Sequence, residues 1–170
     1  AFAVCRPIVV LPRMGLAPGY SLVDQSGERL TSEDLRGSIA VYTFGYTRCE
    51  GPCEAADSVM RVLQDRLPEL ETDGIPVRLV TLSFDPDRDD PDALAAAAAA
   101  HGADPAVWSW ATGEAAMLKN VIGGGFEVYY EALDDGTFRH DLAFVLVDGL
   151  GIVRSSYRVG VPDVDRVLGD

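Results

Sequence analysis

Cysteine is scarce in this sequence, which contains three cysteines among its 170 residues. Small secreted domains that depend on a disulfide framework contain many more, so the chain is not a disulfide scaffold. Cys49 and Cys53 are separated by three residues in the stretch GYTRCEGPCEA, whereas Cys5 stands alone. One close pair and one isolated thiol are the pattern of a specialised site.

Long apolar runs are also missing, since no run approaches the roughly 20 apolar residues that cross a bilayer. The first segment, AFAVCRPIVVLPRMG, is apolar but is interrupted by Pro7 and Pro12. It could be the remnant of a removed signal or membrane anchor, or a tail that packs on the rest of the chain. We expect residues 1–17 to form this tail and residues 18–170 to form one domain with its own core.

Basic side chains are the minority among the charged residues, with 14 Lys and Arg against 27 Asp and Glu and a formal net charge of -13. A surface of this sign repels phosphate backbones and anionic lipid headgroups, so no nucleic-acid partner is expected. It is compatible with a basic docking partner. The hydrophobic fraction of 48% and the charged fraction of 24% are those of an ordinary globular domain.

Hydrophobic periodicity predicts strands and helices that alternate along most of the chain. A polar turn and a short capped helical turn indicate a β-hairpin over residues 18–35. After the cysteine stretch, Val59, Leu63 and Leu70 recur at helical spacing and predict an amphipathic helix of about four turns. The other expected elements are strands at 38–46, 77–83, 107–112 and 126–130, helices at 91–102 and at 112–121 (stopped by glycines 123–125), a strand pair at 142–148 and 151–159, and a short final helix.

This order of elements predicts an α/β fold with a central mixed β-sheet flanked by helices and an N-terminal β-hairpin. Strands separated by helices imply parallel crossovers, and the terminal hairpin is expected to add antiparallel edge strands. Ligand sites in such sheets lie just beyond the carboxyl ends of the strands. Cys49 and Cys53 directly follow the strand at 38–46, so the pair stands where a site is expected.

The residues between the two cysteines favour a particular geometry. Pro52 fits the first turn of a helix and disfavours helical geometry at Gly51. We therefore expect Cys49 in the loop and Cys53 at the start of the helix, whose positive end stabilises a thiolate. The CxxxC spacing makes a two-thiolate metal clip somewhat easier than CxxC does, without excluding redox chemistry. A metal clip, a redox pair and a buried structural pair all remain open on spacing alone.

Two histidines could complete a soft two-thiolate metal site for copper or zinc. His101 ends the alanine-rich helix and is expected to be a helix-end residue in solvent. His140 precedes the apolar stretch LAFVLVD and can face the cysteine loop if the two strands are neighbours. His140 is the better candidate for a ligand, although its position is also common for a turn residue.

Four segments carry a more specific likeness. They are YSLVDQSGERLTSEDLRGSIAVYTFGYTRC, the CxxxC pair itself, TLSFDPDRDDPDAL, and HDLAFVLVD, which begins at His140. Together they resemble the Sco/SenC family, copper-handling proteins with a thioredoxin-like fold that help to assemble cytochrome c oxidase. The likeness runs from about Pro18 to the C-terminus, and the CxxxC motif with the distant histidine is its most specific part.

The resemblance implies a thioredoxin-like domain in which Cys49, Cys53 and His140 bind one copper ion, as copper(I) or copper(II). It implies a metallochaperone for the dinuclear copper centre of cytochrome c oxidase. Its partners would be cytochrome c oxidase subunit two or another copper acceptor, and a copper-donating chaperone. The domain would lie outside the cytoplasm, in the periplasm or on the outer face of the bacterial inner membrane, tethered by an N-terminal anchor. Independently of the resemblance, the polar, glycine-containing segment DDGTFRH is expected to be mobile without metal and to become ordered when His140 binds it.

The cysteine loop departs from the family pattern. The family has C-P-D-V-C-P where this chain has C-E-G-P-C-E, so Glu50 either supplies a negative charge one position early or is a solvent residue. This difference bears on copper affinity and metal preference. The charged loop 85–90 matches the family and is either a docking surface or a capped, solvated helix start.

Two other functions stay open. The pair could act as a thiol-disulfide oxidoreductase that reduces the acceptor's cysteines. Thioredoxins, however, use CxxC and a facing cis-proline, where this chain has CxxxC and His140. Alternatively, the domain is a redox or zinc sensor in which Asp141 or Glu50 completes four-coordination. Cys5 is expected to be an isolated thiol, because AFAVC is a poor lipidation signal.

Overall fold

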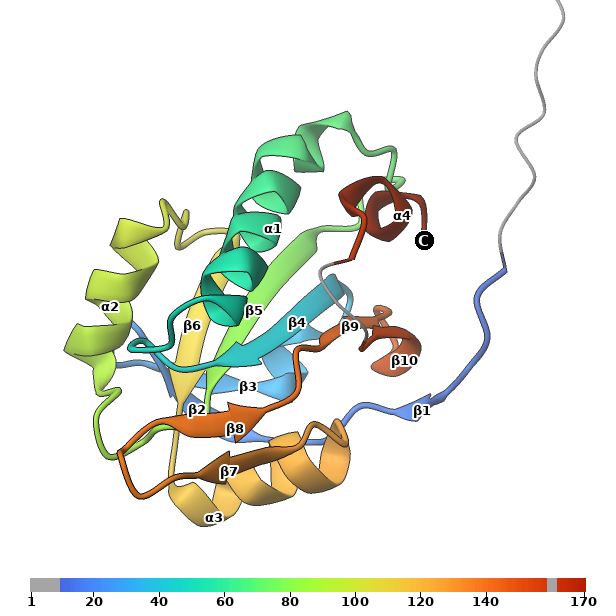
Figure 1. Ribbon diagram of the computed structural model, residues 1–170. Helices are drawn as coiled ribbons and strands as arrows, with labels where there is room; N and C mark the ends of the chain where they lie inside the picture. Colours follow the sequence, from blue (N-terminus) through green and yellow to red (C-terminus); the bar gives the residue numbers. More distant parts are fainter. Residues whose placement is uncertain (1–9, 159–161) are drawn as a thin grey trace, which may run out of the picture.

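The computed structural model describes residues 10–158 and 162–170, so Cys5 and most of the predicted tail lie outside the described residues. Figure 1 shows the arrangement of the elements. In chain order they are β1 (Gly15–Leu16), β2 (Ser21–Asp24), β3 (Arg29–Thr31), the 3-10 helix η1 (Ser32–Leu35), β4 (Ile39–Gly45), α1 (Pro52–Arg66), the 3-10 helix η2 (Leu67–Glu69), β5 (Val77–Ser83), α2 (Pro91–Ala100), β6 (Trp108–Thr112), α3 (Ala115–Leu118), the π-helix η3 (Lys119–Gly125), β7 (Tyr130–Ala132), β8 (Phe138–His140), β9 (Phe144–Val147), β10 (Ile152–Tyr157) and α4 (Val164–Gly169).

The main sheet is mixed, as predicted. Its order is β1-β10-β9-β4-β5-β6-β2-β3, while β7 and β8 form a separate two-stranded sheet. β4, β5 and β6 run parallel, and the other neighbouring strands run antiparallel. The prediction that the C-terminal hairpin lies at the edge is wrong, because β9 pairs with β4 inside the sheet and β1 covers β10. All four residues of β9 are buried, which suits an interior strand with both faces covered.

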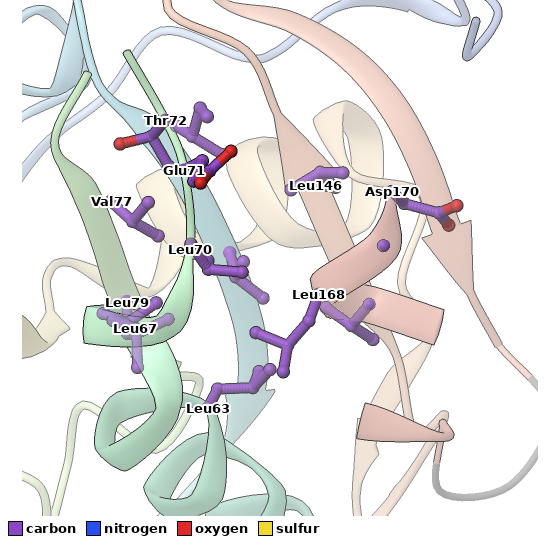
Figure 2. Close-up of a pocket in the computed structure, with 14 residues that line it drawn as sticks. Leu63, Leu67, Leu70, Glu71, Thr72, Val77, Leu79, Leu146, Leu168 and Asp170 are labelled. Carbon is purple, nitrogen blue, oxygen red and sulfur yellow. The ribbon is translucent and has the colours of Figure 1, made fainter. Parts of the chain in front are cut away.

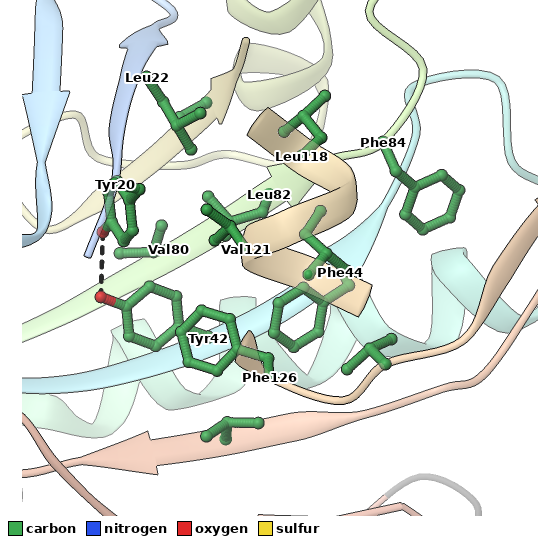
Figure 3. Close-up of a cluster of buried hydrophobic side chains, with 14 of the residues drawn as sticks. Tyr20, Leu22, Tyr42, Phe44, Val80, Leu82, Phe84, Leu118, Val121 and Phe126 are labelled. Atoms are coloured by element: carbon green, nitrogen blue, oxygen red, sulfur yellow. Dashed lines mark hydrogen bonds between the residues drawn. The ribbon is translucent and has the colours of Figure 1, made fainter. Parts of the chain in front are cut away.

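Helices cover both faces of this sheet (Figure 1). α1, α2 and α4 share one core with inward-facing strand residues such as Val41, and α3 with η3 shares the other core with residues such as Tyr42. Successive side chains of a strand point to opposite faces, so β4 contributes to both cores. Figure 3 shows the second core, where the hydroxyls of Tyr20 and Tyr42 are hydrogen-bonded at 3.0 Å.

The helix predicted after the cysteine loop is confirmed as α1. Pro52 occupies its first turn, and Val59, Met60 and Leu63 form its buried stripe. The helix ends at Arg66, where a short 3-10 turn replaces the last part of the predicted helix before Leu70. The N-terminal hairpin is confirmed as well, because β2 and β3 pair antiparallel in the predicted region.

The glycines at 123–125 do not stop the preceding helix, contrary to the prediction. The chain continues from α3 into η3, where the Phe126 N–H donates to the Val121 carbonyl in an i to i−5 bond. Glycine is needed here for packing, because a Cβ on Gly125 would clash with the ring of Pro18. The glycines therefore mark a close approach between η3 and the chain before β2.

The predicted strand at 126–130 is also mostly wrong, since only its last residue, Tyr130, belongs to β7. Glu127 has a positive φ of 56°, which breaks an extended run. Burial of Phe126 and Val128 against the second core produces the apolar pattern that resembles a strand. The extended segment instead begins at Tyr130 and pairs with β8, which ends at His140.

Candidate metal centre

The loop between β4 and α1 places the two cysteines as predicted. Cys49 lies in the loop and is half-buried, and Cys53 lies in the first turn of α1 with 4% of its surface exposed. Gly51 caps the helix with φ at 71°, a conformation that favours glycine. The cysteines are joined by a disulfide, and their Cα atoms are 5.7 Å apart, within the usual range for such a bond.

Gly45 at the end of β4 makes room for one of the sulfurs. A Cβ at this position would lie 3.3 Å from the Cys53 Sγ atom, closer than side chains normally approach. A larger residue would push Cys53 away from the end of the strand. The sequence GYTRC therefore contains a glycine whose role depends on packing against the pair.

The loop is fastened to the charged segment that follows β5. The Thr47 N–H and hydroxyl donate to the two carboxylate oxygens of Asp89 at 2.9 and 2.6 Å, and the Ser83 hydroxyl donates to Asp89 at 2.5 Å. Asp89 is fully buried, so it is not part of a solvated helix start. Asp90 does cap α2 as expected, accepting from the Ala93 N–H at 2.8 Å. The hydrogen bonds of Asp89 therefore fix the position of the cysteine loop relative to the segment that follows β5.

His140 reaches the cysteine pair from the separate two-stranded sheet. Its Nε2 atom lies 3.6 Å from Cys49 Sγ and 3.5 Å from Cys53 Sγ. Its Nδ1 atom lies 3.0 Å from the Asp141 carbonyl oxygen, which accepts the N–H of this tautomer. That bond leaves the Nε2 lone pair directed to the sulfurs, the arrangement found around metal-ligating histidines.

Aromatic rings surround the imidazole on the protein side. The centroid of His140 is 5.2 Å from that of Phe84 and 6.1 Å from that of Tyr46. The Tyr46 hydroxyl accepts a hydrogen bond from the Phe138 N–H at 3.3 Å, which ties the cysteine loop to β8. These contacts exclude water from one side of His140 and fix the orientation of its ring.

The three side chains fit a soft metal ion once the disulfide is reduced. Among residues 10–158 and 162–170, Cys49, Cys53 and His140 form the one group of three or more potential ligands, with ligand atoms within 4.8 Å of one another. Two thiolates and an imidazole suit copper(I), copper(II) or zinc. Neither Asp141 nor Glu50 joins this group, and the Asp141 carboxylate instead accepts from the Tyr129 N–H at 3.2 Å.

His101 ends α2 as predicted, but its side chain is only 32% exposed, so it is only partly in solvent. His101 stacks on Trp110 with centroids 5.6 Å apart, and its Nε2 lies 3.4 Å from Asp57 Oδ2. Burial lowers the pKa of His101, an effect that the charge of Glu54 opposes. Burial raises the pKa of Asp57 to about 7, and Glu54 adds to that shift. The sequence pattern does not indicate this contact between α1 and the end of α2.

An apolar pocket lies at the other end of the sheet. Its volume is about 250 Å³, and Figure 2 shows leucines from α1, η2 and α4 pointing into it. It is lined by Ile39 and Val77, at the starts of β4 and β5, whereas the cysteine loop follows the end of β4. The pocket contains none of the three potential ligands and is separate from the metal centre.

Comparison with known proteins decides the family. The model of the SCO1/SenC family matches residues 12–167. The chain belongs to the SCO1/SenC family. This confirms the resemblance that the four sequence segments indicated.

Relatives in this family share the fold. The SCO1 protein homolog of Bacillus subtilis is 30% identical over 94 residues, which cover 55% of this chain and 47% of that protein. The crystal structure of a SCO1/SenC family lipoprotein from Bacillus anthracis has a TM-score of 0.80 at 24% identity, covering 89% of this chain and 90% of that one. Arabidopsis thaliana ScoI, solved with copper bound, has a TM-score of 0.79 at 23% identity, covering 91% of this chain and 94% of that one. The matched segments span less than half the length of the curated relatives. The predicted thioredoxin-like fold is confirmed.

Proposed function

We propose that this chain binds one copper ion through Cys49, Cys53 and His140 and delivers it during assembly of cytochrome c oxidase. The observation that carries the proposal is the approach of His140 Nε2 to within 3.6 Å of both sulfurs from a different part of the chain. Family membership and the copper-bound Arabidopsis relative support the same function.

The chemistry of the donors accounts for binding and release. Reduction of the disulfide exposes two thiolates, which together hold copper(I), and the imidazole adds a nitrogen ligand that favours copper(II). A copper ion held by three ligands can pass to a thiolate- and imidazole-rich acceptor by stepwise exchange, one ligand at a time. Oxidation of the pair to the disulfide removes two ligands and abolishes the site.

The acceptor that fits this transfer is the dinuclear copper centre of cytochrome c oxidase subunit two, or another acceptor of the same chemistry. A copper-donating chaperone would load the site. Such an acceptor places the domain outside the cytoplasm, in the periplasm or at the outer face of the inner membrane. Within the described residues, none of the helices is both long enough and apolar enough to span a bilayer.

Titration of the reduced protein with copper(I) and copper(II) tests the proposal. We expect one ion per chain and, with copper(II), an absorption band from thiolate-to-copper charge transfer. The variant C49S/C53S serves as the control and should show neither binding nor the band. If the reduced wild-type protein binds neither copper(I) nor copper(II), the proposed copper function is refuted.

The disulfide in the structure favours a second candidate, reduction of the acceptor's cysteines. Cys49 is the more exposed sulfur, so its thiolate would attack the acceptor disulfide and release one acceptor thiolate. Cys53 would then attack the mixed disulfide, release the second acceptor thiol and form the Cys49–Cys53 bond. Two electrons pass from the pair to the acceptor. Mixing the reduced protein with a disulfide-containing acceptor peptide and counting the thiols tests this step.

A further inference from the structure

The sheet that carries His140 lies against the cysteine loop through side-chain contacts. β7 and β8 pair with each other in a sheet separate from the main one, so main-sheet hydrogen bonding does not fix their position. One set of contacts is aromatic and lies near His140 itself. A second set is charged and lies at the turn between the two strands, around Gly136.

Asp85 is at the centre of the charged contacts. It follows β5, and its side chain is 2% exposed. Its Oδ2 atom lies 3.7 Å from Arg48 Nη2, and its Oδ1 atom lies 3.5 Å from Arg88 Nη1. Oδ2 is buried and has no hydrogen-bond partner. Burial and the neighbouring carboxylate of Asp89 raise the pKa of Asp85, whereas Arg88 and Arg48 oppose this shift and stabilise the charged form.

Both arginines reach the turn of the β7–β8 hairpin. Arg48, the residue before Cys49, donates from Nη2 to the Gly136 carbonyl at 3.4 Å. A Cβ on Gly136 would lie 2.8 Å from Arg88 Nη2, so this guanidinium lies directly against the turn. Gly136 has a φ of 81°, and β8 runs from this turn to His140.

We infer that Asp85, through Arg48 and Arg88, positions the β7–β8 hairpin so that His140 stays within ligand distance of the cysteine pair. Asp85 is a positioning residue, because it acts through the hairpin and does not touch the metal ligands. This inference rests on the proposed copper function and makes Asp85 a determinant of the preference for copper(II) over copper(I). Nitrogen ligation matters more to copper(II), whereas two thiolates can hold copper(I) nearly alone.

The carboxylate is required because the two arginines repel each other. Each lies beside the same hairpin turn, and an anion between them converts that repulsion into two attractions. Asp89 cannot replace Asp85 in this role, because Thr47 and Ser83 already occupy its oxygens. Without Asp85, the guanidinium groups would separate and release the turn that leads to His140.

The variant D85N tests the inference, because asparagine keeps the size of the side chain and removes its charge. We expect copper(II) affinity to fall roughly 10- to 100-fold, the usual cost of losing a residue that orients a ligand. Copper(I) affinity should change much less. In a H140A background, D85N should cause no further loss, because the effect passes through the imidazole. D65N is the control, because it makes the same substitution but breaks the exposed Arg61–Asp65 ion pair of 3.0 Å on α1, away from the hairpin.

Equal losses of copper(II) affinity with and without His140, or no loss at all, would overturn the inference. If D85N fails to fold, R88Q takes its place, because Arg88 is 44% exposed and its loss removes one of the two links. It should show a smaller loss that also vanishes in the H140A background.

A metal-free measurement separates this inference from the proposed function. In the oxidised protein without copper, backbone amides of residues 134–141 should exchange hydrogen faster in D85N than in wild type or D65N. If the wild type binds neither copper state, the proposed function fails, and equal exchange in the three proteins would then also overturn the positioning role.

Discussion

At the scale of single residues, the site depends on three donors of different origin. Cys49 comes from a loop, Cys53 from the start of α1 and His140 from the end of β8. Each has a neighbour that sets its position: the Asp141 carbonyl for the imidazole, Gly45 for the Cys53 sulfur and Thr47 for the loop. In the proposed function the two sulfurs serve both metal binding and redox exchange, whereas the imidazole contributes mainly to the binding of copper(II).

The variant H140A separates copper carriage from reductase chemistry. We expect copper(II) affinity to fall at least as far as the roughly 10- to 100-fold cost of losing a ligand's supporting residue, because a ligand itself is removed. Copper(I) affinity should fall less. The rate of thiol–disulfide exchange should change only modestly, because it follows thiolate fraction and access. The measurements are competition titrations for both copper states and stopped-flow exchange with a small disulfide.

The opposite pattern would reverse the order of the two functions. If H140A binds both copper states like wild type but no longer reduces an acceptor disulfide, His140 is an acid–base partner of the thiols. C53S provides the reference, because it should lose both activities.

The buried Asp57 gives the stability of the protein a characteristic pH dependence. Its folded-state pKa is raised from 3.8 to about 7, so the folded state holds a proton that the unfolded state releases. This contribution therefore falls as pH rises from about 4 to 7, by up to about 4 kcal/mol. His101, whose pKa is lowered, contributes in the opposite direction below about pH 6.5 and reduces the total.

The variant D57N should remove this slope. We expect D57N to lose less stability than wild type between pH 4.5 and pH 7.5, as measured by urea unfolding at each pH. Other carboxylates contribute equally to both proteins, so the difference between the two curves reports on Asp57. Parallel curves would show that Asp57 titrates normally in the folded protein.

At the scale of elements, the β7–β8 hairpin is the part on which metal binding should act. The rest of the site stands on β4 and α1, which are embedded in the main sheet and its helical layer. The hairpin has polar residues at its turn, where the Asp135 carboxylate accepts from the Thr137 N–H at 2.9 Å. Coordination by His140 would add a bond between this hairpin and the rest of the domain.

Copper should therefore protect the hairpin from hydrogen exchange. We expect slower exchange of amides at residues 134–141 when the reduced protein binds copper(I), because coordination couples local order to binding. Helix α2, which lies outside the site, should exchange equally with and without metal. Equal protection of residues 134–141 in both states would mean that the hairpin is already fully ordered.

At the scale of the whole molecule, the fold must survive reduction of the disulfide, because only the reduced pair can hold a metal. The bond joins residues four apart in the sequence, so it closes a very short loop. Two hydrophobic cores on opposite faces of the sheet hold the domain together independently of this bond.

Reduction should therefore cost little stability. A loop this short corresponds to about 2 kcal/mol or less in the chain-entropy account. In a domain of this size that amounts to a drop in Tm of at most about 8 °C. Thermal unfolding with and without a reductant measures it, with C49S/C53S as a control that should not respond. Loss of cooperative unfolding on reduction would show that the disulfide is structural.

Local sequence determined most of the elements and the placement of Cys49 in the loop and Cys53 at the start of α1. The apolar stripe of Val59 and Leu63 predicted α1, and Pro52 after Gly51 predicted where that helix begins. Asp90 predicted the start of α2 in the same way. These features depend on interactions between residues only a few positions apart. A short stretch of sequence contains all of those residues, so the features can be predicted from it. The resemblance to the family motifs predicted His140 as a third ligand.

Tertiary structure alone decided what depends on contacts between distant segments. The apolar pattern at 126–130 reflects burial against the second core rather than a strand, and the glycines at 123–125 reflect contact with Pro18. The contacts of the buried carboxylates of Asp57 with His101, and of Asp85 with Arg48, join residues that lie far apart in the chain. Charged residues read from sequence look solvated, because burial is set by what packs over them. The sequence therefore predicted the three donor residues, and the packing of β8 against the cysteine loop brought them together.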